Sequence, residues 1–334
     1  MNVVCKGRPE TLAFVIQHLF GSDDFERLGR AEDRGEEHDL FVTDRRFTIR
    51  YRSSLRHAML VPRWVRQRLA LSGTWPDTLD RLPRHLRKEL RRQLRKGSYH
   101  ARVESRMSAR LQFYDQHLVP YVKRRFGDNA VLRGQRAFRR EVDGSVLLEL
   151  RDGDSFLGAS LLSLTDDVLS IGGTALSSDH AVPSDVLDYF CLVLAQCVGC
   201  RWLDLGLTRP HLEDGIFAYK AKWRPSLLPV GPLKSPIRIL PLRSSPAVTG
   251  FFSRNGFLER RGDGFIVRRL NSSGEPSQTR LSELSLLAQR SGLDELIVAC
   301  SGCGGALPKV APEHARLLEF EPGDGLIDAF LRST

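Results

Sequence analysis

The chain of 334 residues has no long hydrophobic run. No apolar stretch approaches the roughly 20 residues that a helix needs to cross a bilayer, which argues against a membrane-spanning protein. The first residues show no charged segment followed by a sustained apolar one, so we expect no secretory signal and a cytoplasmic location. With 41% hydrophobic and 27% charged residues, the composition is that of a globular protein with more than one packing unit.

Cysteine is scarce, and its spacing gives only a weak metal signal. Two cysteine pairs have CxxC spacing, Cys197 with Cys200 and Cys300 with Cys303. Such spacing is typical of zinc sites and of redox-active cysteines. The first pair ends an apolar helix, where small buried side chains explain it, and the second lies in a glycine-rich segment typical of an exposed loop. No histidine lies near either pair in sequence. We therefore predict no metal site, with a zinc site joining both pairs as the alternative.

Basic residues outnumber acidic residues in the first part of the chain but not in the second. Residues 1–140 contain 31 lysines and arginines against 16 acidic residues, whereas residues 141–334 contain 19 against 24. Such asymmetry predicts an anionic partner for the basic part, which would be nucleic acid, a phosphorylated small molecule or a membrane surface.

The basic charge is densest in residues 81–97. Leucine recurs there every fourth residue from Leu82 to Leu94, and Gly97 follows, which predicts an amphipathic helix with one buried seam. Eight cations occupy its other faces: Arg81, Arg84, Arg87, Lys88, Arg91, Arg92, Arg95 and Lys96. This face is either solvated or binds phosphate groups, such as those of tRNA.

Hydrophobic periodicity predicts an α/β (α+β) chain in three parts: an α/β region over residues 1–80, a central domain over 81–270 and a small α/β tail over 281–334. The first part is expected to begin with a strand at 2–5 and a helix at 10–20. For the central part we predict helices at 108–126, kinked at Pro120, 186–198 and 246–255, and strands at 146–151, 156–163, 168–175, 201–205, 238–242 and 265–270. After a polar linker at 271–279, the tail is expected to contain a helix up to 291, strands at 295–300 and 315–320, and a helix at 325–331.

The most informative stretch is Asp204 to Lys222. It follows a buried strand directly and presents charged side chains, and ligands of helix-flanked sheets bind where strands end. We therefore expect the functional site there.

The predicted succession of three antiparallel strands, a helix, a strand and then the segment Phe251 to Phe257 before a last strand resembles the GNAT acyltransferase fold, a mixed and mainly antiparallel sheet flanked by helices. Two pieces are similar to its FemAB and CelD-like branch: the basic segment 86–97 followed by Phe113-Tyr114-Asp115, and Asp204-Leu205-Gly206 followed by Tyr219-Lys220-Ala221-Lys222-Trp223. Arg224 stands where that branch has glycine. The family's Arg/Gln-x-x-Gly-x-Gly/Ala loop, which holds the pyrophosphate of coenzyme A, has no counterpart at 176–183.

The resemblance implies an acyl transfer in which a donor carbonyl is activated and the attacking amine loses a proton. Lys220 would supply positive charge to the carbonyl or to a donor phosphate, and Asp204 or His211 would take the proton. The backbone of Gly172, Gly173 and Thr174 would offer N–H groups. Two further residues, Tyr114 and Arg209, would position the substrate. The alternatives are structural roles: a turn cap for Asp204, a surface loop for His211 and a core position for Tyr114.

Three functions remain open from the sequence. The first is an N-acyltransferase that uses an acyl-CoA, such as acetyl-CoA, and a small-molecule amine or surface-polymer precursor. The second is a FemAB-like transferase whose donor is an aminoacyl-tRNA held by the basic helix. The third is a non-catalytic binding or scaffold protein, which the missing pyrophosphate loop favours.

Overall fold

The computed structural model describes residues 2–6, 15, 19, 27–30, 38–44, 58–127, 130, 132–177, 184–230, 236–243, 245–271, 292–301 and 315–320. The chain forms two compact units, and each is assembled from separate segments. Unit 1 contains Met1–Arg66, Leu207–Ala221 and Ser226–Thr334, and unit 2 contains Gln67–Gly206 and Lys222–Pro225. The predicted boundaries at 80 and 270 follow composition along the chain, whereas these units follow contacts between distant segments.

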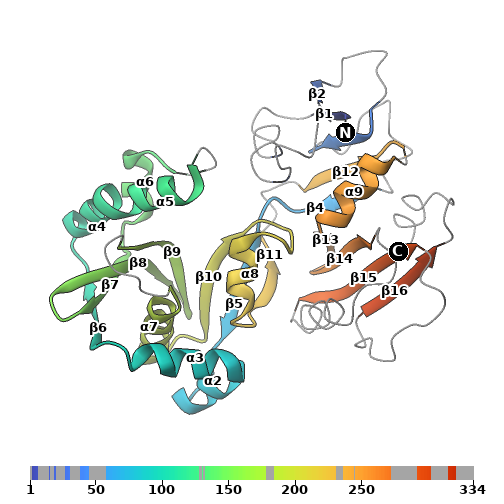
Figure 1. Ribbon diagram of the computed structural model, residues 1–334. Coiled ribbons are helices and arrows are strands. Elements are labelled where there is room, and N and C mark those ends of the chain that lie inside the picture. The colour runs from blue at the N-terminus through green and yellow to red at the C-terminus, as the bar shows by residue number, and fades with distance from the viewer. Residues whose placement is uncertain are drawn as a thin grey trace. The chain divides into compact units, whose positions relative to one another are not determined.

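Unit 2 is built on one twisted sheet whose strands lie in the order β5-β10-β9-β8-β7-β6 (Figure 1). These strands are β5 (Val65–Ala70), β6 (Tyr99–Glu104), β7 (Val146–Asp152), β8 (Ser155–Thr165), β9 (Val168–Leu176) and β10 (Trp202–Thr208). From β6 to β9 all neighbours are antiparallel, and β10 is parallel to β9. The meander and the strand after it were predicted from the sequence, and both are confirmed. The Asp-Gly turn between β7 and β8 has Gly153 at φ 56°, as a tight hairpin requires.

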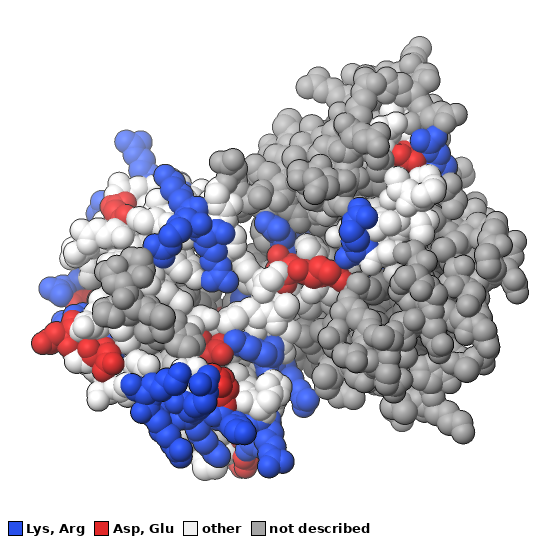
Figure 2. Space-filling model, viewed as in Figure 1, with Lys and Arg blue, Asp and Glu red and all other residues white. Residues whose placement is uncertain are grey.

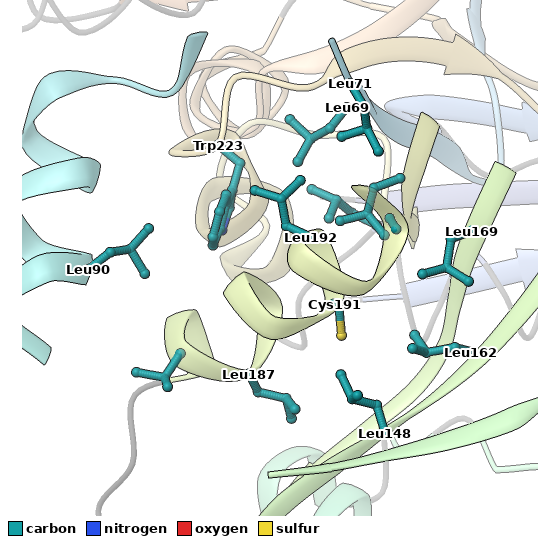
Figure 3. Packing of buried hydrophobic residues seen from close by; sticks show 14 of the residues in the cluster. Leu69, Leu71, Leu90, Leu148, Leu162, Leu169, Leu187, Cys191, Leu192 and Trp223 are labelled. Carbon is teal, nitrogen blue, oxygen red and sulfur yellow. The ribbon is translucent and has the colours of Figure 1, made fainter. Parts of the chain in front are cut away.

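Helices cover both faces of this sheet, because neighbouring side chains of a strand point to opposite faces. Leu148 and Leu162 pack with α7 (Ser184–Cys197), α3 (Arg84–Leu94) and α2 (Trp75–Arg81), whereas Leu147 and Leu161 pack with the helices of residues 107–141. Figure 3 shows Leu187, Cys191 and Leu192 of α7 between Leu90 and the leucines of the strands. The three layers give a mixed α/β fold with a mainly antiparallel sheet flanked by helices.

The leucine seam of the basic helix is buried as predicted. Leu82, Leu86 and Leu90 are 2–4% exposed, and their cationic neighbours face outward. The predicted single helix is divided, however, because Pro83 separates α2 from α3. A proline lacks the N–H that a continuous helix needs and disfavours a helical conformation in the residue before it.

The helix expected at 108–126 has a π-helical turn in place of a simple kink. It consists of α4 (Met107–Phe113), the π-helical segment η5 (Tyr114–Leu118) and α5 (Val119–Phe126). The π turn directly precedes Pro120, which cannot donate the backbone bond of a regular turn. Leu118 of this segment packs on β9, where a Cβ added to Gly173 would lie 3.2 Å from it. A further short helix, α6 (Gln135–Glu141), follows where the sequence showed no element.

Unit 1 contains two sheets. The first, in the order β2-β1-β3-β12-β4, consists of β1 (Asn2–Lys6), β2 (Arg27–Arg30), β3 (Leu40–Thr43), β4 (Met59–Val61) and β12 (Ile237–Pro241), and it packs on α9 (Pro246–Arg254). The second, β13-β14-β15-β16, consists of β13 (Phe257–Arg261), β14 (Gly264–Asn271), β15 (Leu293–Ser301) and β16 (Ala315–Phe320). The short elements α8 (Gly215–Ala221) and β11 (Ser226–Pro229) also belong to unit 1.

Two findings in unit 1 could not be read from the linear sequence. The predicted tail strands exist as β15 and β16, but β15 pairs in parallel with β14 and so extends an earlier sheet. The helix and strand that close the predicted GNAT succession, α9 and β14, lie in unit 1, whereas the preceding meander lies in unit 2. Four predicted segments fall outside the described residues: the helices at 10–20, before 291 and at 325–331, and the linker after 271. No helix of the described part is long and apolar enough to span a membrane.

The pH dependence of stability provides a test of the helix packing in unit 2. His117 of η5 lies 4.4 Å from the Phe156 ring and 6.2 Å from the Phe113 ring, and burial lowers its pKa below the ordinary value of 6.5, partly opposed by Glu149. The unfolded chain then binds a proton at a higher pH than the folded chain, so the free energy of unfolding should fall as the pH drops below about 6.5. We expect His117→Phe to reduce this loss between pH 7.5 and 5.5 in urea titrations. The control His100→Phe, at an exposed position, should leave the loss of stability unchanged. An unchanged pH profile in His117→Phe would contradict the assignment of this loss to His117.

Candidate active site

The sheet of unit 2 opens between β9 and β10. The two strands are paired at only three positions, and the last pair joins Asp204 to Ser170. Beyond it β9 continues to Leu176 and β10 to Thr208. Backbone N–H and C=O groups of β9 on this side therefore need partners other than β10, and the polar groups of a ligand are one possible set of partners.

A β-bulge lies on β9 where the strands have parted. Leu161 of β8 is paired with Gly173 and Leu162 with Ile171, so Gly172 is the extra residue. Gly172 is exposed, and Gly173 and Thr174 are half-buried. A Cβ at Gly172 would find only one neighbour, a carbonyl oxygen at 3.7 Å, so the space in front of it is open. The bulge thus presents main chain that a ligand can approach closely.

Thr174 is fixed in this edge by a side-chain bond across the sheet. Its hydroxyl lies 2.8 Å from that of Ser160 on β8, and Ser160 is fully buried. Ser160 was not identified from the sequence; its small polar side chain in an apolar strand was the available signal.

Asp204 is the most buried of the predicted site residues. Its side chain is 1% exposed, its carboxylate lies 3.7 Å from the Arg68 guanidinium, and it accepts a bond of 2.8 Å from the backbone N–H of Gly206. Gly206 has φ 82°, a left-handed conformation that glycine adopts without strain. Asp204 therefore holds the left-handed backbone at Gly206, in the part of β10 that is no longer paired with β9. Arg68 was missed because it lies 136 residues earlier, on β5.

Three other predicted residues lie in unit 1, after β10. Lys220 of α8 donates a hydrogen bond of 3.2 Å to the carbonyl of Leu207. Arg209 lies 3.8 Å from the carboxylate of Asp214, whose other oxygen accepts from the N–H of Phe217 and so caps α8. His211 forms a β-bridge with Phe257 and contacts its ring edge-on. Arg209 and His211 thus lie in the segment between β10 and α8, and Lys220, in the last turn of α8, bonds back to β10.

Tyr114 is a core residue of unit 2. It is 6% exposed, its ring lies 4.1 Å from that of Phe138, and its hydroxyl donates to the carbonyl of Arg133. This environment gives Tyr114 a packing role beneath the sheet.

Arg224 occupies the position at which the FemAB and CelD-like segment has glycine. The backbone conformation at this position is one that favours glycine. Its φ is 53°, in the left-handed region that costs a residue with a Cβ roughly 1–2 kcal/mol. Trp223 before it is 1% exposed and packs in the core of unit 2, as Figure 3 shows.

Two of the cysteines, Cys191 and Cys200, have a packing role in unit 2. Cys200 and Cys191 are buried in the core with α7, and burial raises the pKa of both thiols. Cys197 is exposed, and Cys303 lies outside the described residues. Within the described ranges no group of three His, Cys, Asp or Glu side chains could hold a metal ion.

Comparison with known proteins gives similarity at the level of solved structures. No protein-family model and no curated protein matches the chain. Among solved structures, it is similar to the C-terminal domain of a putative lysylphosphatidylglycerol synthetase from Agrobacterium fabrum, with 15% identity, a TM-score of 0.37 and coverage of 62% of this chain and 69% of that one. FemX is similar with 13% identity, a TM-score of 0.41 and coverage of 62% and 73%. A tandem GNAT protein from the clavulanic acid biosynthesis pathway is similar with 12% identity, a TM-score of 0.32 and coverage of 62% of this chain and 66% of that one. These similarities concern the fold, and the chemistry of this chain has to be argued from its own residues.

The turn at Gly206 can be tested by substitution. A side chain at φ 82° is strained, so we expect Gly206→Ala to lower the free energy of unfolding by about 1–2 kcal/mol. Gly206→Asn should cost less, because asparagine tolerates this conformation better. Gly134→Ala is the control, since Gly134 has φ −62° and an added Cβ would meet nothing within 4 Å. Equal losses in urea denaturation for Gly206→Ala and Gly134→Ala would show that the conformation at 206 is unimportant.

Proposed function

We propose that this protein is an N-acyltransferase that moves an acyl group from an acyl-CoA, such as acetyl-CoA, to an amine of a small molecule or surface-polymer precursor. The observation that supports it is the open edge of β9, where the strand has lost its neighbour and carries a bulge at Gly172. Such an edge offers fixed backbone donors to a carbonyl oxygen in a place that a ligand can reach.

The chemistry that fits this edge needs no covalent enzyme intermediate. The amine nitrogen attacks the thioester carbonyl carbon, and the carbonyl oxygen becomes an oxyanion that N–H groups near Gly172 would stabilise. The carbon–sulfur bond then breaks, and the electron pair leaves with sulfur. The proton that nitrogen loses ends on that sulfur, directly or through water, so the products are an amide and a free thiol.

The predicted residues would have different roles in the reaction. Asp204 is buried and bonded to Arg68 and Gly206, so we assign it the positioning of β10 rather than proton transfer. His211 is the remaining candidate for the proton, and Arg209 is a candidate for substrate positioning. Lys220 is the candidate cation for the oxyanion or a donor phosphate. Tyr114 would act only through packing.

A second donor, an aminoacyl-tRNA, is favoured by one observation, the exposed cations of α3 and its C-cap, Arg95. Arg84, Lys88, Arg91 and Arg95 all face solvent, and Figure 2 shows lysine and arginine gathered over this part of unit 2. tRNA binding should weaken steeply with salt because each neutralised phosphate releases counterions, whereas acyl-CoA binding should depend on salt much less. Thermal shifts with acetyl-CoA, long-chain acyl-CoA and tRNA, together with mass spectrometry of co-purifying molecules, separate the two donors. Binding of any of these donors would count against the third function, a non-catalytic binding or scaffold protein.

The open edge can be blocked without changing the core. In Gly172→Val the Cβ fits, but the larger side chain fills the space that a donor carbonyl needs, so we expect turnover or donor binding to fall at least about 10-fold, or about 1.4 kcal/mol. The melting temperature should change little. Gly73→Val, at an exposed loop position with open space, is the matched control. Full activity of Gly172→Val would exclude the bulge from the site.

The role of Lys220 is tested by its removal. We expect Lys220→Ala to reduce turnover at least about 10-fold with little loss of melting temperature, because a hydrogen bond such as that from Lys220 to the Leu207 carbonyl contributes only about 1 kcal/mol to folding. Lys222→Ala is the comparison, since that lysine pairs with Asp185. An equally active Lys220→Ala variant would remove this lysine from the proposed site.

A further inference from the structure

Unit 2 has an open hollow of about 700 Å³ at the junction of α2 and α3. Five cations line it, Arg81, Arg84, Arg87, Lys88 and Arg224, and Asp80 is the single acidic residue of its lining. The first four come from one continuous segment, and Arg224 is supplied by a segment more than 130 residues away in the sequence. The hollow is therefore a product of the tertiary structure.

Its charge is largely uncompensated. The Asp80 carboxylate is paired with Arg87. Arg81, Arg84, Lys88 and Arg224 form no ion pair with any residue that the structure describes. Arg84 and Lys88 are four residues apart on one helix, where like charges repel each other. Four unpaired cations around one concave surface favour an anionic occupant, since it would relieve this repulsion.

The backbone at Arg224 gives an independent reason to regard the hollow as functional. Its left-handed φ of 53° would suit glycine, and the arginine is therefore strained. Buried Trp223 and Pro225 hold the segment on either side. Since glycine would relieve the strain, the local stability of the chain does not explain an arginine here, whereas a role for its guanidinium in the hollow does.

The start of α3 adds hydrogen-bond donors to the same place. This helix has eleven residues, its N-cap Pro83 provides no side-chain bond, and its first turn contains no acidic residue. Leu82, Pro83, Arg84 and His85 all border the hollow. The N–H groups of a helix's first turn and the positive end of its dipole favour a bound anion.

We infer that the hollow binds the phosphate groups of a compact phosphorylated ligand, of the size and charge of a diphosphate. A terminal phosphate group carries roughly −1.5 to −2 charges and a bridged internal one about −1, so a diphosphate brings about three negative charges to the four unpaired cations. A compact ligand is favoured over an extended polyanion because the lining comes from two segments around a concavity. The remaining cations of α3 and its end, Arg91, Arg92, Arg95 and Lys96, are outside this lining.

The test is calorimetric titration of the full chain with inorganic pyrophosphate at constant ionic strength. We expect binding that weakens at least about 10-fold in Arg84→Ala and in Arg224→Gly, because each loses a charge-assisted contact. Arg224→Gly should also melt no lower than the unmodified protein, since it relieves the strained backbone. Arg95→Ala is the matched control, with the same charge removed from the end of α3 but outside the hollow, and it should bind pyrophosphate as the unmodified protein does.

Binding to vesicles and to RNA identifies the source of the phosphate groups and provides outcomes that would overturn the inference. Vesicles with a phosphomonoester lipid, bound by the protein and displaced by pyrophosphate, would support a lipid headgroup; pyrophosphate binding without vesicle binding would support a free ligand. The inference fails if the unmodified protein does not bind pyrophosphate, or if Arg95→Ala weakens binding as much as Arg84→Ala. It also fails if an RNA oligonucleotide binds and both of these variants weaken it equally while pyrophosphate does not compete. None of these measurements depends on acyl transfer.

Discussion

The short pairing between β9 and β10 is the constraint on which the candidate site depends. Two strands of a sheet normally continue side by side, because their backbone groups need partners. Here pairing stops after Ser170 and Asp204, and two local features keep the strands apart. A bulge at Gly172 disrupts β9, and the left-handed Gly206 with its bond to Asp204 redirects β10. The opening is thus built into the sheet by specific residues.

Helices pack on both faces of β9 beside that opening. The helical segment Tyr114–Leu118 packs against β9 from one face, with Leu118 close to Gly173, and α7 packs against the other. Asp204 is held by Arg68 from β5. A site formed by main chain on a packed sheet keeps its donors in place without reorganisation, which is what stabilisation of a developing oxyanion requires.

The basic surface is a separate feature of the same unit. Its leucines fix α3 on the core, so its cations have to face outward, and this alone would describe any amphipathic helix. The hollow differs because Arg224 joins it from another segment and does so in a strained conformation. The two features therefore give different expectations, a salt-sensitive contact along the helix and a defined phosphate site at its start.

The sequence by itself determined the elements whose signals are local. The meander from β7 to β9, the apolar helix α7, the strand ending near Asp204 and the buried leucine seam all follow from periodicity and turn residues within a few positions. Local signals also located the charged segment Asp204 to Lys222. The division at Pro83 follows from the proline itself, whereas the π turn before Pro120 and the short strands β5 and β6 depend on small local energies that packing overrides.

Only the tertiary structure decided which distant segments meet. It paired Arg68 with Asp204, Ser160 with Thr174, β15 with β14, and Arg224 with the start of α3. It also assigned Asp204 and Lys220 to different units and made Tyr114 part of the core. The physical reason is that such contacts are selected by the total burial and hydrogen bonding of the folded chain, to which residues far apart in sequence contribute together, whereas periodicity reports only the preference of each segment for one face.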